Sequence, residues 1–199
     1  MELWIASSNT GKIKEFQNLL YNFPQVQIHT QNEISGFHPA EETGDSFLAN
    51  ARLKARALRS VKNQHWVLAE DSGLEVTGLN NLPGIHSARY AGPKARDSEN
   101  VAKLMKMMQI RQVSDRSAQF RATLVVFTPT GEEWIFEGQM KGQIAPKVAG
   151  QNGFGYDPIF IPEGQTKTLA ELDPGFKNRL SHRALAFKAF LEKVKTEIS

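Results

Sequence analysis

The chain contains no cysteine among its 199 residues. Disulfide bonds, thiolate metal sites and cysteine nucleophiles are therefore excluded, and a bound metal ion has to use oxygen or imidazole ligands. Long apolar runs are missing as well, because no uncharged stretch of about 18 residues occurs. The N-terminus also lacks the basic region followed by an apolar run that a secretion signal has. We therefore expect a cytoplasmic protein without a membrane span.

A strong excess of one charge is also missing. The formal net charge is +3 and the pI is about 9.1. Such mild basicity suits an anionic ligand but is too small and too dispersed to require a nucleic acid. Internal repeats, low-complexity tracts and linker-like shifts of composition do not occur. At this length the chain fits one large domain or two small lobes.

Apolar periodicity predicts strands that alternate with helices in the first part of the chain. Helices are expected over residues 13–20, 46–61, 97–108 and 184–194. Strands are expected over residues 3–6, 26–28, 66–69, 120–127, 133–137 and 142–145. Residues 43–45 offer capping groups for the second helix, and Ser181 offers one for the last. This order is typical of an α/β fold.

The first strand is followed at once by a candidate phosphate loop. It consists of Ser7, Ser8, Asn9, Thr10, Gly11 and Lys12. A loop of this kind that opens a helix directs backbone N–H groups and a positive helix end at a ligand. The P-loop pattern is absent, which disfavours a P-loop NTPase. Simple helix capping also explains Ser, Asn and Gly at such a turn.

Two neighbouring carboxylates, Glu70 and Asp71, follow the predicted strand over residues 66–69. In open α/β sheets, ligands bind at the carboxyl ends of strands. Desolvated like charges repel each other unless a cation or a proton lies between them, and carboxylate oxygens suit Mg²⁺. The acidic run over residues 41–45 precedes a helix, and the helix dipole alone explains it.

Two later clusters also carry polar chemistry. In residues 153–158, glycines flank aromatic side chains, so the backbone can approach a ligand closely and a ring can stack on a base. A turn with two core aromatics is the alternative. Lys177 and the run Ser181-His182-Arg183 place basic groups at a helix start, where they can neutralise phosphates. Ordinary capping beside a solvated basic face is the alternative there.

In their order along the chain, these motifs resemble the inosine triphosphate pyrophosphatase family. Members of that family cleave non-standard purine nucleoside triphosphates to the monophosphate and pyrophosphate. The resemblance spans nearly the whole chain and includes residues 40–44, 69–74, 83–92, 153–160 and 181–183. It implies a single domain over residues 1–199 with an elongated, two-lobed α/β fold. A central mixed β-sheet flanked by helices, a nucleotide cleft between the lobes and a homodimer are also implied.

The same resemblance assigns roles to individual residues. Asp71 becomes the catalytic residue that activates the attacking water, and Glu41 and Asp71 become the ligands of Mg²⁺. The implied substrate-binding residues are Ser7, Ser8, Asn9, Thr10, Gly11, Lys12, Lys54, Ser72, Phe154, Gly155, Tyr156, Asp157, Lys177, His182 and Arg183. Within this set, residues 154–157 would stack on and border the base, and His182 and Arg183 would read the 6-oxo edge of the purine.

Two other functions stay open at this point. A Maf-like pyrophosphatase of modified nucleotides also begins with a strand and a Ser/Asn/Lys phosphate loop, although its later motifs are missing here. A non-catalytic nucleotide- or RNA-binding module would use the basic loop and the aromatics without turnover. Such a module gains nothing from a buried acidic pair, so Asp71 favours the enzyme. We expect a nucleoside triphosphate as the partner, with no nucleic acid and no membrane.

Overall fold

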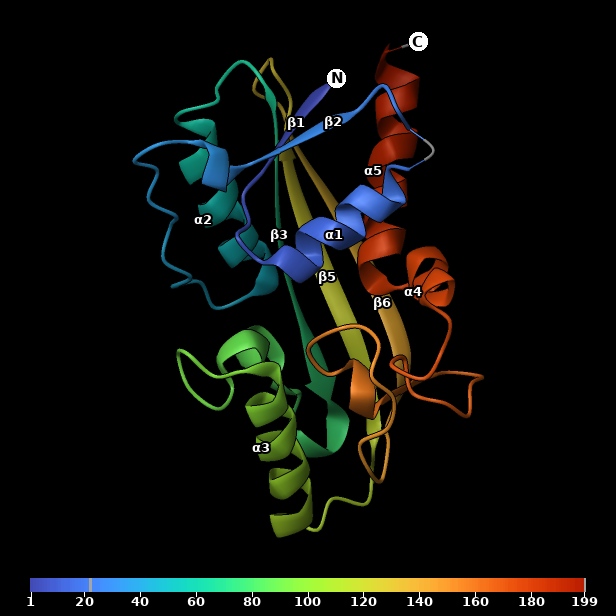
Figure 1. Ribbon diagram of the computed structural model, residues 1–199. Helices are drawn as coiled ribbons and strands as arrows, with labels where there is room; N and C mark the ends of the chain where they lie inside the picture. Colours follow the sequence, from blue (N-terminus) through green and yellow to red (C-terminus); the bar gives the residue numbers. More distant parts are fainter. Residues whose placement is uncertain (22, 199) are drawn as a thin grey trace. The chain divides into compact units, whose positions relative to one another are not determined.

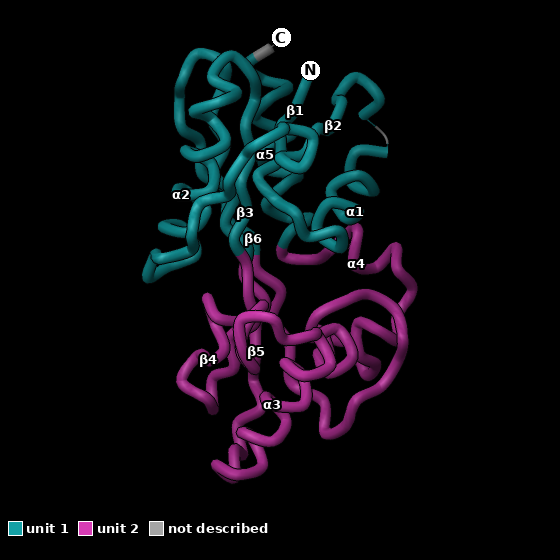
Figure 2. Tube along the Cα trace, turned by 60° about the vertical axis from the view of Figure 1, so that its left-hand side comes forward, with its two compact units in different colours: residues 1–71, 122–138, 183–199 teal, residues 72–121, 139–182 magenta. Residues whose placement is uncertain are grey.

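The computed structural model describes residues 1–21 and 23–198 of the chain. The chain divides into two compact units (Figure 2). Unit 1 consists of residues 1–71, 122–138 and 183–199, and unit 2 consists of residues 72–121 and 139–182. Each unit has its own apolar core, and each is described separately below.

In the first part of the chain, helices and strands alternate as its periodicity predicts. The α-helices are α1 (Thr10–Leu19), α2 (Phe47–Arg59), α3 (Asp97–Ile110), α4 (Pro174–Leu180) and α5 (His182–Ile198). The strands are β1 (Glu2–Ile5), β2 (Gln27–Thr30), β3 (Trp66–Val76), β4 (Leu82–Pro83), β5 (Ser117–Phe127), β6 (Glu133–Ile144) and β7 (Phe160–Pro162). Short 3₁₀ helices cover Gln31–Glu33, Thr77–Leu79, Gly84–Arg89 and Asp157–Ile159.

The strands pair in a mixed sheet, which confirms the predicted α/β class. Within the described residues the sheet has seven strands in the order β2-β1-β3-β5-β6-β7, and β4 pairs with β3 (Figure 1). Strand β1 is parallel to both β2 and β3. Strand β4 is antiparallel to β3, and β7 is antiparallel to β6. The sheet is therefore parallel around β1 and antiparallel at β4 and β7.

The core of unit 1 lies on both faces of its strands. Successive side chains of a strand point to opposite faces, so β1 sends Leu3 and Ile5 to one face and Trp4 to the other. Leu3 and Ile5 belong to a cluster with Phe16 of α1 and Phe187 of α5. Trp4 belongs to a second cluster that contains the apolar side chains of α2. Helices α1 and α5 therefore cover one face and α2 covers the other (Figure 1).

The core of unit 2 forms where α3 packs against strands. Leu104 and Met108 of α3 cluster with Val76 of β3, Phe120 of β5 and Met140 of β6. Burial of these side chains removes apolar surface from water, which is the main favourable term in folding. The cluster packs α3 with these three strands, and it also contains Tyr156 of the predicted base-binding residues.

One predicted strand end is wrong in a way that matters for the site. Strand β3 does not end at residue 69 but continues to Val76. Its parallel neighbour β1 stops at Ile5, which pairs with Leu68. Strand β3 continues beside β5, its other neighbour in the sheet, and also pairs with β4 at Glu75 and Val76. Glu70 and Asp71 therefore lie within a strand, just beyond the end of its parallel neighbour.

Two smaller expectations are also corrected. The N-cap of α2 is Ser46, not a residue of 43–45, because the Ser46 hydroxyl accepts the backbone N–H of Ala49 at 3.2 Å. The strands predicted over residues 133–137 and 142–145 form the single strand β6, and its last residues pair with β7. No helix within residues 1–21 and 23–198 combines the length and apolar character that a membrane span requires.

Candidate active site

The loop between β1 and α1 contains the predicted phosphate-binding residues. The Oδ1 atom of Asn9 accepts the backbone N–H of Lys12 at 3.0 Å and so caps α1. The Ser7 hydroxyl accepts the backbone N–H of Asn9 at 3.2 Å. Ser8 and Thr10 are exposed beside this cap. The positive end of α1 therefore opens next to hydroxyl side chains, an arrangement that suits an anion.

The two carboxylates of β3 do not form a pair. Side chains alternate along the strand, and their partners show that they point to opposite faces of the sheet. Glu70 binds Lys12 of α1 and Arg183 of α5, whereas Asp71 binds Lys54 of α2. The two carboxylates therefore do not need a shared cation or proton between them, because each forms salt bridges with different basic side chains.

Asp71 is held at both of its oxygens by side chains of α2. The Lys54 ammonium donates to Asp71 Oδ1 at 3.0 Å and to Glu42 Oε1 at 2.7 Å. The Asn50 side chain donates to Asp71 Oδ2 at 3.2 Å. The Oδ1 atom of Asn50 accepts the backbone N–H of Gly44 at 2.8 Å, so one buried amide joins the acidic loop to Asp71. The carboxylate is therefore fixed in position before any ligand binds.

Burial and charge act in opposite directions on the Asp71–Lys54 pair. Burial disfavours the ionised carboxylate and raises the pKa of Asp71, against the attraction of Lys54 and Lys12. Burial by itself would lower the pKa of Lys54, but the charges of Asp71 and Glu42 outweigh it and raise that pKa. A carboxylate with a raised pKa is a stronger base, which is a property that a general base needs.

On the other face of β3, buried charges form a chain. One terminal nitrogen of Arg183 donates a hydrogen bond to Glu70 Oε1 at 2.9 Å, and the other donates one to Glu15 of α1. Lys12 Nζ lies 2.8 Å from the second oxygen of Glu70. Burial would lower the pKa of Arg183, but the two carboxylates raise it further above its ordinary value. Within unit 1, Arg183 therefore fixes Glu70, which in turn holds Lys12.

The predicted metal ligands differ in their surroundings. Glu41 is exposed, and the ammonium of Lys54 contacts Glu42 rather than Glu41. Within residues 1–21 and 23–198 there is no cluster of three or more His, Asp or Glu side chains that could hold a metal ion. Asp71 and Glu41 nevertheless both carry carboxylate oxygens, the ligand type of Mg²⁺, which binds through one or two carboxylates and takes its other ligands from water and substrate phosphates.

In unit 2, the predicted base-binding loop is held by two carboxylates. Asp157 Oδ2 accepts the backbone N–H of Phe154 at 3.0 Å and the Lys177 ammonium at 2.6 Å. The same ammonium lies 4.4 Å from the centroid of the Phe154 ring. Asp97, at the start of α3, accepts the backbone N–H of Gly155 at 2.7 Å. The structure thus brings Phe154, Asp157 and Lys177 together.

Backbone geometry explains the glycines of this loop. Gly153 has a φ of +78°, and a Cβ there would lie 2.0 Å from Asp157 Oδ2. Tyr156 is buried, and its hydroxyl donates to the backbone oxygen of Ser87 at 2.8 Å. Burial raises the pKa of Tyr156 above its ordinary value. Tyr156 therefore anchors the loop, while the half-buried Phe154 is the ring beside the Lys177 ammonium.

The remaining predicted residues lie next to the points in the sequence where the chain passes from one unit to the other. Ser72 follows Asp71 in β3 and is half-buried. His182 is the first residue of α5, and its side chain is buried. In the chain, Asp71 and Ser72 belong to different units, and so do His182 and Arg183.

Asn50 is a site residue that the sequence prediction missed. The buried face of α2 contains Phe47, Ala51 and Leu58, and Asn50 and Lys54 lie next to that apolar stripe. A fully buried amide needs hydrogen-bond partners, so a polar residue beside an apolar helix face was the available signal. Asp97 gave no comparable signal, because acidic residues are ordinary in the first turn of a helix, and Glu15 gave none because charged residues are ordinary along a helix.

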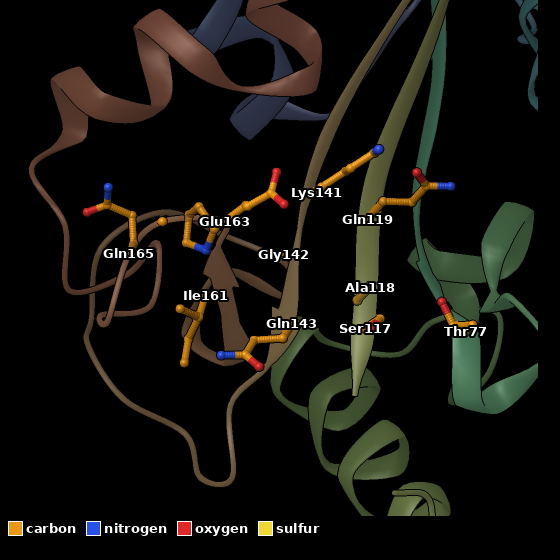
Figure 3. Close-up of a pocket in the computed structure, with 12 residues that line it drawn as sticks. Thr77, Ser117, Ala118, Gln119, Lys141, Gly142, Gln143, Ile161, Glu163 and Gln165 are labelled. Carbon is orange, nitrogen blue, oxygen red and sulfur yellow. The ribbon is translucent and has the colours of Figure 1, made fainter. Parts of the chain in front are cut away.

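A polar pocket of about 510 Å³ lies elsewhere in unit 2 (Figure 3). Strands β5, β6 and β7 line it with side chains that include Gln119, Lys141, Gln143 and Ile161. None of the predicted site residues lines this pocket. It is therefore separate from the clusters around Asp71 and Phe154.

A model of a known family matches a range of the chain that includes residues of both units. The model of the Ham1 family matches residues 3–193. The chain belongs to the Ham1 family. This membership confirms the family resemblance that the ordered motifs predicted.

Relatives and solved structures of this family match almost the full chain. A dITP/XTP pyrophosphatase of Bdellovibrio bacteriovorus is 61% identical over 196 residues, which is 98% of each chain. A dITP/XTP pyrophosphatase of Listeria monocytogenes is 42% identical over 98% of this chain and 94% of its own length. The Ham1 protein of Staphylococcus aureus superposes with a TM-score of 0.87 at 40% identity, covering 99% of this chain and 100% of that one. A HAM1 protein of Coxiella burnetii superposes with a TM-score of 0.86 at 39% identity, covering 99% of both chains.

Proposed function

We propose that this chain hydrolyses non-standard purine nucleoside triphosphates, namely ITP, dITP and XTP, to the monophosphate and pyrophosphate. The observation that carries this proposal is the buried Asp71, held by Lys54 and Asn50 on the α2 side of β3. The names of the Bdellovibrio and Listeria relatives support the same activity. Such an enzyme removes altered nucleotides from the nucleotide pool.

The reaction requires a water oxygen to bond to the α-phosphorus while the bond to the bridging oxygen of the β-phosphate breaks. We assign Asp71 the role of general base that takes the proton of the attacking water. Lys12 and Lys54, together with the loop of residues 7–11, bind the phosphate oxygens and neutralise their charge. Pyrophosphate leaves with the electron pair of the broken bond, and the nucleoside monophosphate keeps the water oxygen.

Magnesium is part of the proposal. Asp71 and Glu41 would hold the ion, and Mg²⁺ would supply charge stabilisation at the phosphate oxygens and ease deprotonation of water. The Lys54 and Lys12 charges near Asp71 would not replace Mg²⁺, because the triphosphate carries more negative charge than these two lysines neutralise.

Base recognition is assigned to residues of unit 2 and to Arg183. Phe154 stacks on the purine, with Gly155, Tyr156 and Asp157 bordering it. Ser72 and Lys177 bind the substrate beside them, and His182 and Arg183 donate to the 6-oxo edge. An adenine presents a 6-amino group to those donors and is rejected, because polar mismatches generate large selectivity ratios. The nucleotide cleft, the homodimer and the cytoplasmic location stay predictions.

The decisive experiment is a pyrophosphate-release assay on a panel of nucleoside triphosphates, each with and without Mg²⁺. We expect rapid release from ITP, dITP and XTP, slow release from ATP and GTP, and loss of activity on chelation. Preference for a modified pyrimidine nucleotide would favour the Maf-like alternative. Tight binding with no release under any condition would favour the non-catalytic binding module.

A further inference from the structure

A ring of the unit 2 core stacks on His182. The ring of Phe120, on β5, lies parallel to the His182 imidazole, with 4.9 Å between the ring centroids and 9° between the planes. Phe120 is 8% exposed and His182 is 4% exposed, so the stack is shielded from water. On its other contact, Phe120 meets Phe160 of β7 at 4.7 Å with a tilt of 55°. Of these two contacts of Phe120, the one with His182 is face to face and the one with Phe160 is tilted.

The plane of an imidazole decides where its hydrogen bonds point. Both ring nitrogens lie in that plane, and a hydrogen bond weakens steeply when the donor is turned away from the acceptor. The terminal torsion of a histidine side chain is broad, so rotamer preference alone does not fix the plane. A flat ring packed against one face of the imidazole supplies the missing constraint.

The source of that constraint is rigid. Phe120 lies in the eleven-residue strand β5, between the buried residues Ala118 and Ala122. Phe160, which is fully buried, supports it. An interior that is packed in this way holds side chains in single rotamers. The position of His182 is thus tied to a strand, although His182 itself begins a helix.

We propose that Phe120 is a positioning residue for the selection of 6-oxopurines, acting through His182. Its ring holds the imidazole in the plane from which a ring nitrogen donates to the 6-oxo group. The inference rests on the proposed function, in which His182 reads that edge. It adds a residue that does not touch the nucleotide and that no sequence motif identifies.

The test compares two Phe-to-Leu variants of the same core. Phe120→Leu removes the ring that stacks on His182, and Phe160→Leu makes the same chemical change at the other ring that contacts Phe120. We expect Phe120→Leu to lower the ratio of kcat/KM for ITP over ATP by roughly 3- to 10-fold, the range expected for the loss of one aromatic stack. Phe160→Leu should keep that ratio within about 2-fold of the parental ratio, even if it lowers Tm as much as Phe120→Leu does.

Two further readouts separate positioning from simple destabilisation. In a His182→Gln background, Phe120→Leu should have no additional effect on the ITP-to-ATP ratio, because its target is gone. Long-range ¹H–¹⁵N spectra of the His182 imidazole should change in Phe120→Leu and stay unchanged in Phe160→Leu. If Phe120→Leu does not fold, Phe120→Met replaces it, since a flexible thioether fills the volume without presenting a flat face.

An ITP-to-ATP ratio in folded Phe120→Leu or Phe120→Met that equals the parental ratio overturns the inference. Equal losses of the ratio in the Phe120 and Phe160 variants overturn it as well, because they would reflect general loosening of the core. Failure of the proposed function looks different, because the parent protein itself would then release no pyrophosphate from ITP or XTP.

Discussion

Asp71 is the residue on which the proposed chemistry depends. Asp71→Asn keeps the shape of the side chain but removes the negative charge and the ability to accept a proton. We expect kcat to fall by about 10²- to 10⁴-fold while nucleotide binding is largely retained. Steady-state kinetics on XTP and a binding titration measure the two effects. The exposed Asp45→Asn in the preceding loop serves as the control, and turnover of Asp71→Asn within a few-fold of the parent would remove Asp71 from the catalytic role.

The pH dependence of the reaction follows from the same carboxylate. Burial raises the pKa of Asp71 above the ordinary value of 3.8. A base works only when deprotonated, so kcat/KM should be lost as the pH falls through this raised pKa, at a higher pH than an exposed aspartate would give. Activity should continue to rise into the alkaline range, because attack under Mg²⁺ benefits from easier deprotonation of water. A maximum near pH 5 would contradict the assignment.

Lys54 provides a check on the direction of that shift. The Lys54 charge lowers the pKa of Asp71 against the effect of burial. Lys54→Met removes this attraction, so the acidic limb of the kcat/KM profile should move to higher pH, in addition to an overall loss of activity. A limb that moves to lower pH would show that another group titrates.

At the scale of elements, Arg183 joins α5 to β3 and α1 through buried ion pairs. Its side chain is 2% exposed, and both partners are carboxylates. Arg183→Ala leaves Glu15 and Glu70 without this counterion, and we expect a loss of about 3–5 kcal/mol in the free energy of unfolding. Urea denaturation measures it, with the exposed Arg56→Ala of α2 as the control. A loss below about 1 kcal/mol, the value typical of a surface pair, would contradict a structural role for this arginine.

This structural role affects how base reading by Arg183 can be tested. Arg183→Ala mixes a change of fold stability with a change of selectivity, whereas Arg183→Lys keeps a charge beside Glu70. If Arg183 also reads the base, Arg183→Lys should lower the ITP-to-ATP ratio, because an ammonium does not reproduce the planar donor geometry of the guanidinium.

At the scale of the whole molecule, substitutions in the two units should affect different steps. Phe154→Ala in unit 2 removes a stacking face worth about 1–3 kcal/mol, and this loss applies to every purine. We expect kcat/KM for ITP, XTP, GTP and ATP to fall by similar factors, with the acidic limb of the pH profile unchanged. Asp71→Asn in unit 1 should instead lower kcat for all substrates. A selective loss for ITP alone in Phe154→Ala would assign Phe154 to edge reading rather than stacking.

Much of the fold and of the site was predictable from short stretches of sequence. The loop over residues 7–12, the helix around Lys54 and the first residues of β3 follow from local periodicity, capping groups and glycines, whereas the continuation of β3 through Asp71 does not. Gly153 is fixed by a local requirement as well, since its backbone φ of +78° and the nearby Asp157 leave no room for a Cβ.

Tertiary structure alone decided which charges neutralise each other. The sequence placed Glu70 next to Asp71 and so indicated a repelling pair, but the strand continues through both residues and directs them to opposite faces. It also decided that Arg183 lies between Glu15 and Glu70, and that Phe120 stacks on His182. These contacts join residues that are far apart in the chain. Local propensity and spacing determine elements and their exposed motifs, whereas long-range packing determines the partners of a buried charge or ring.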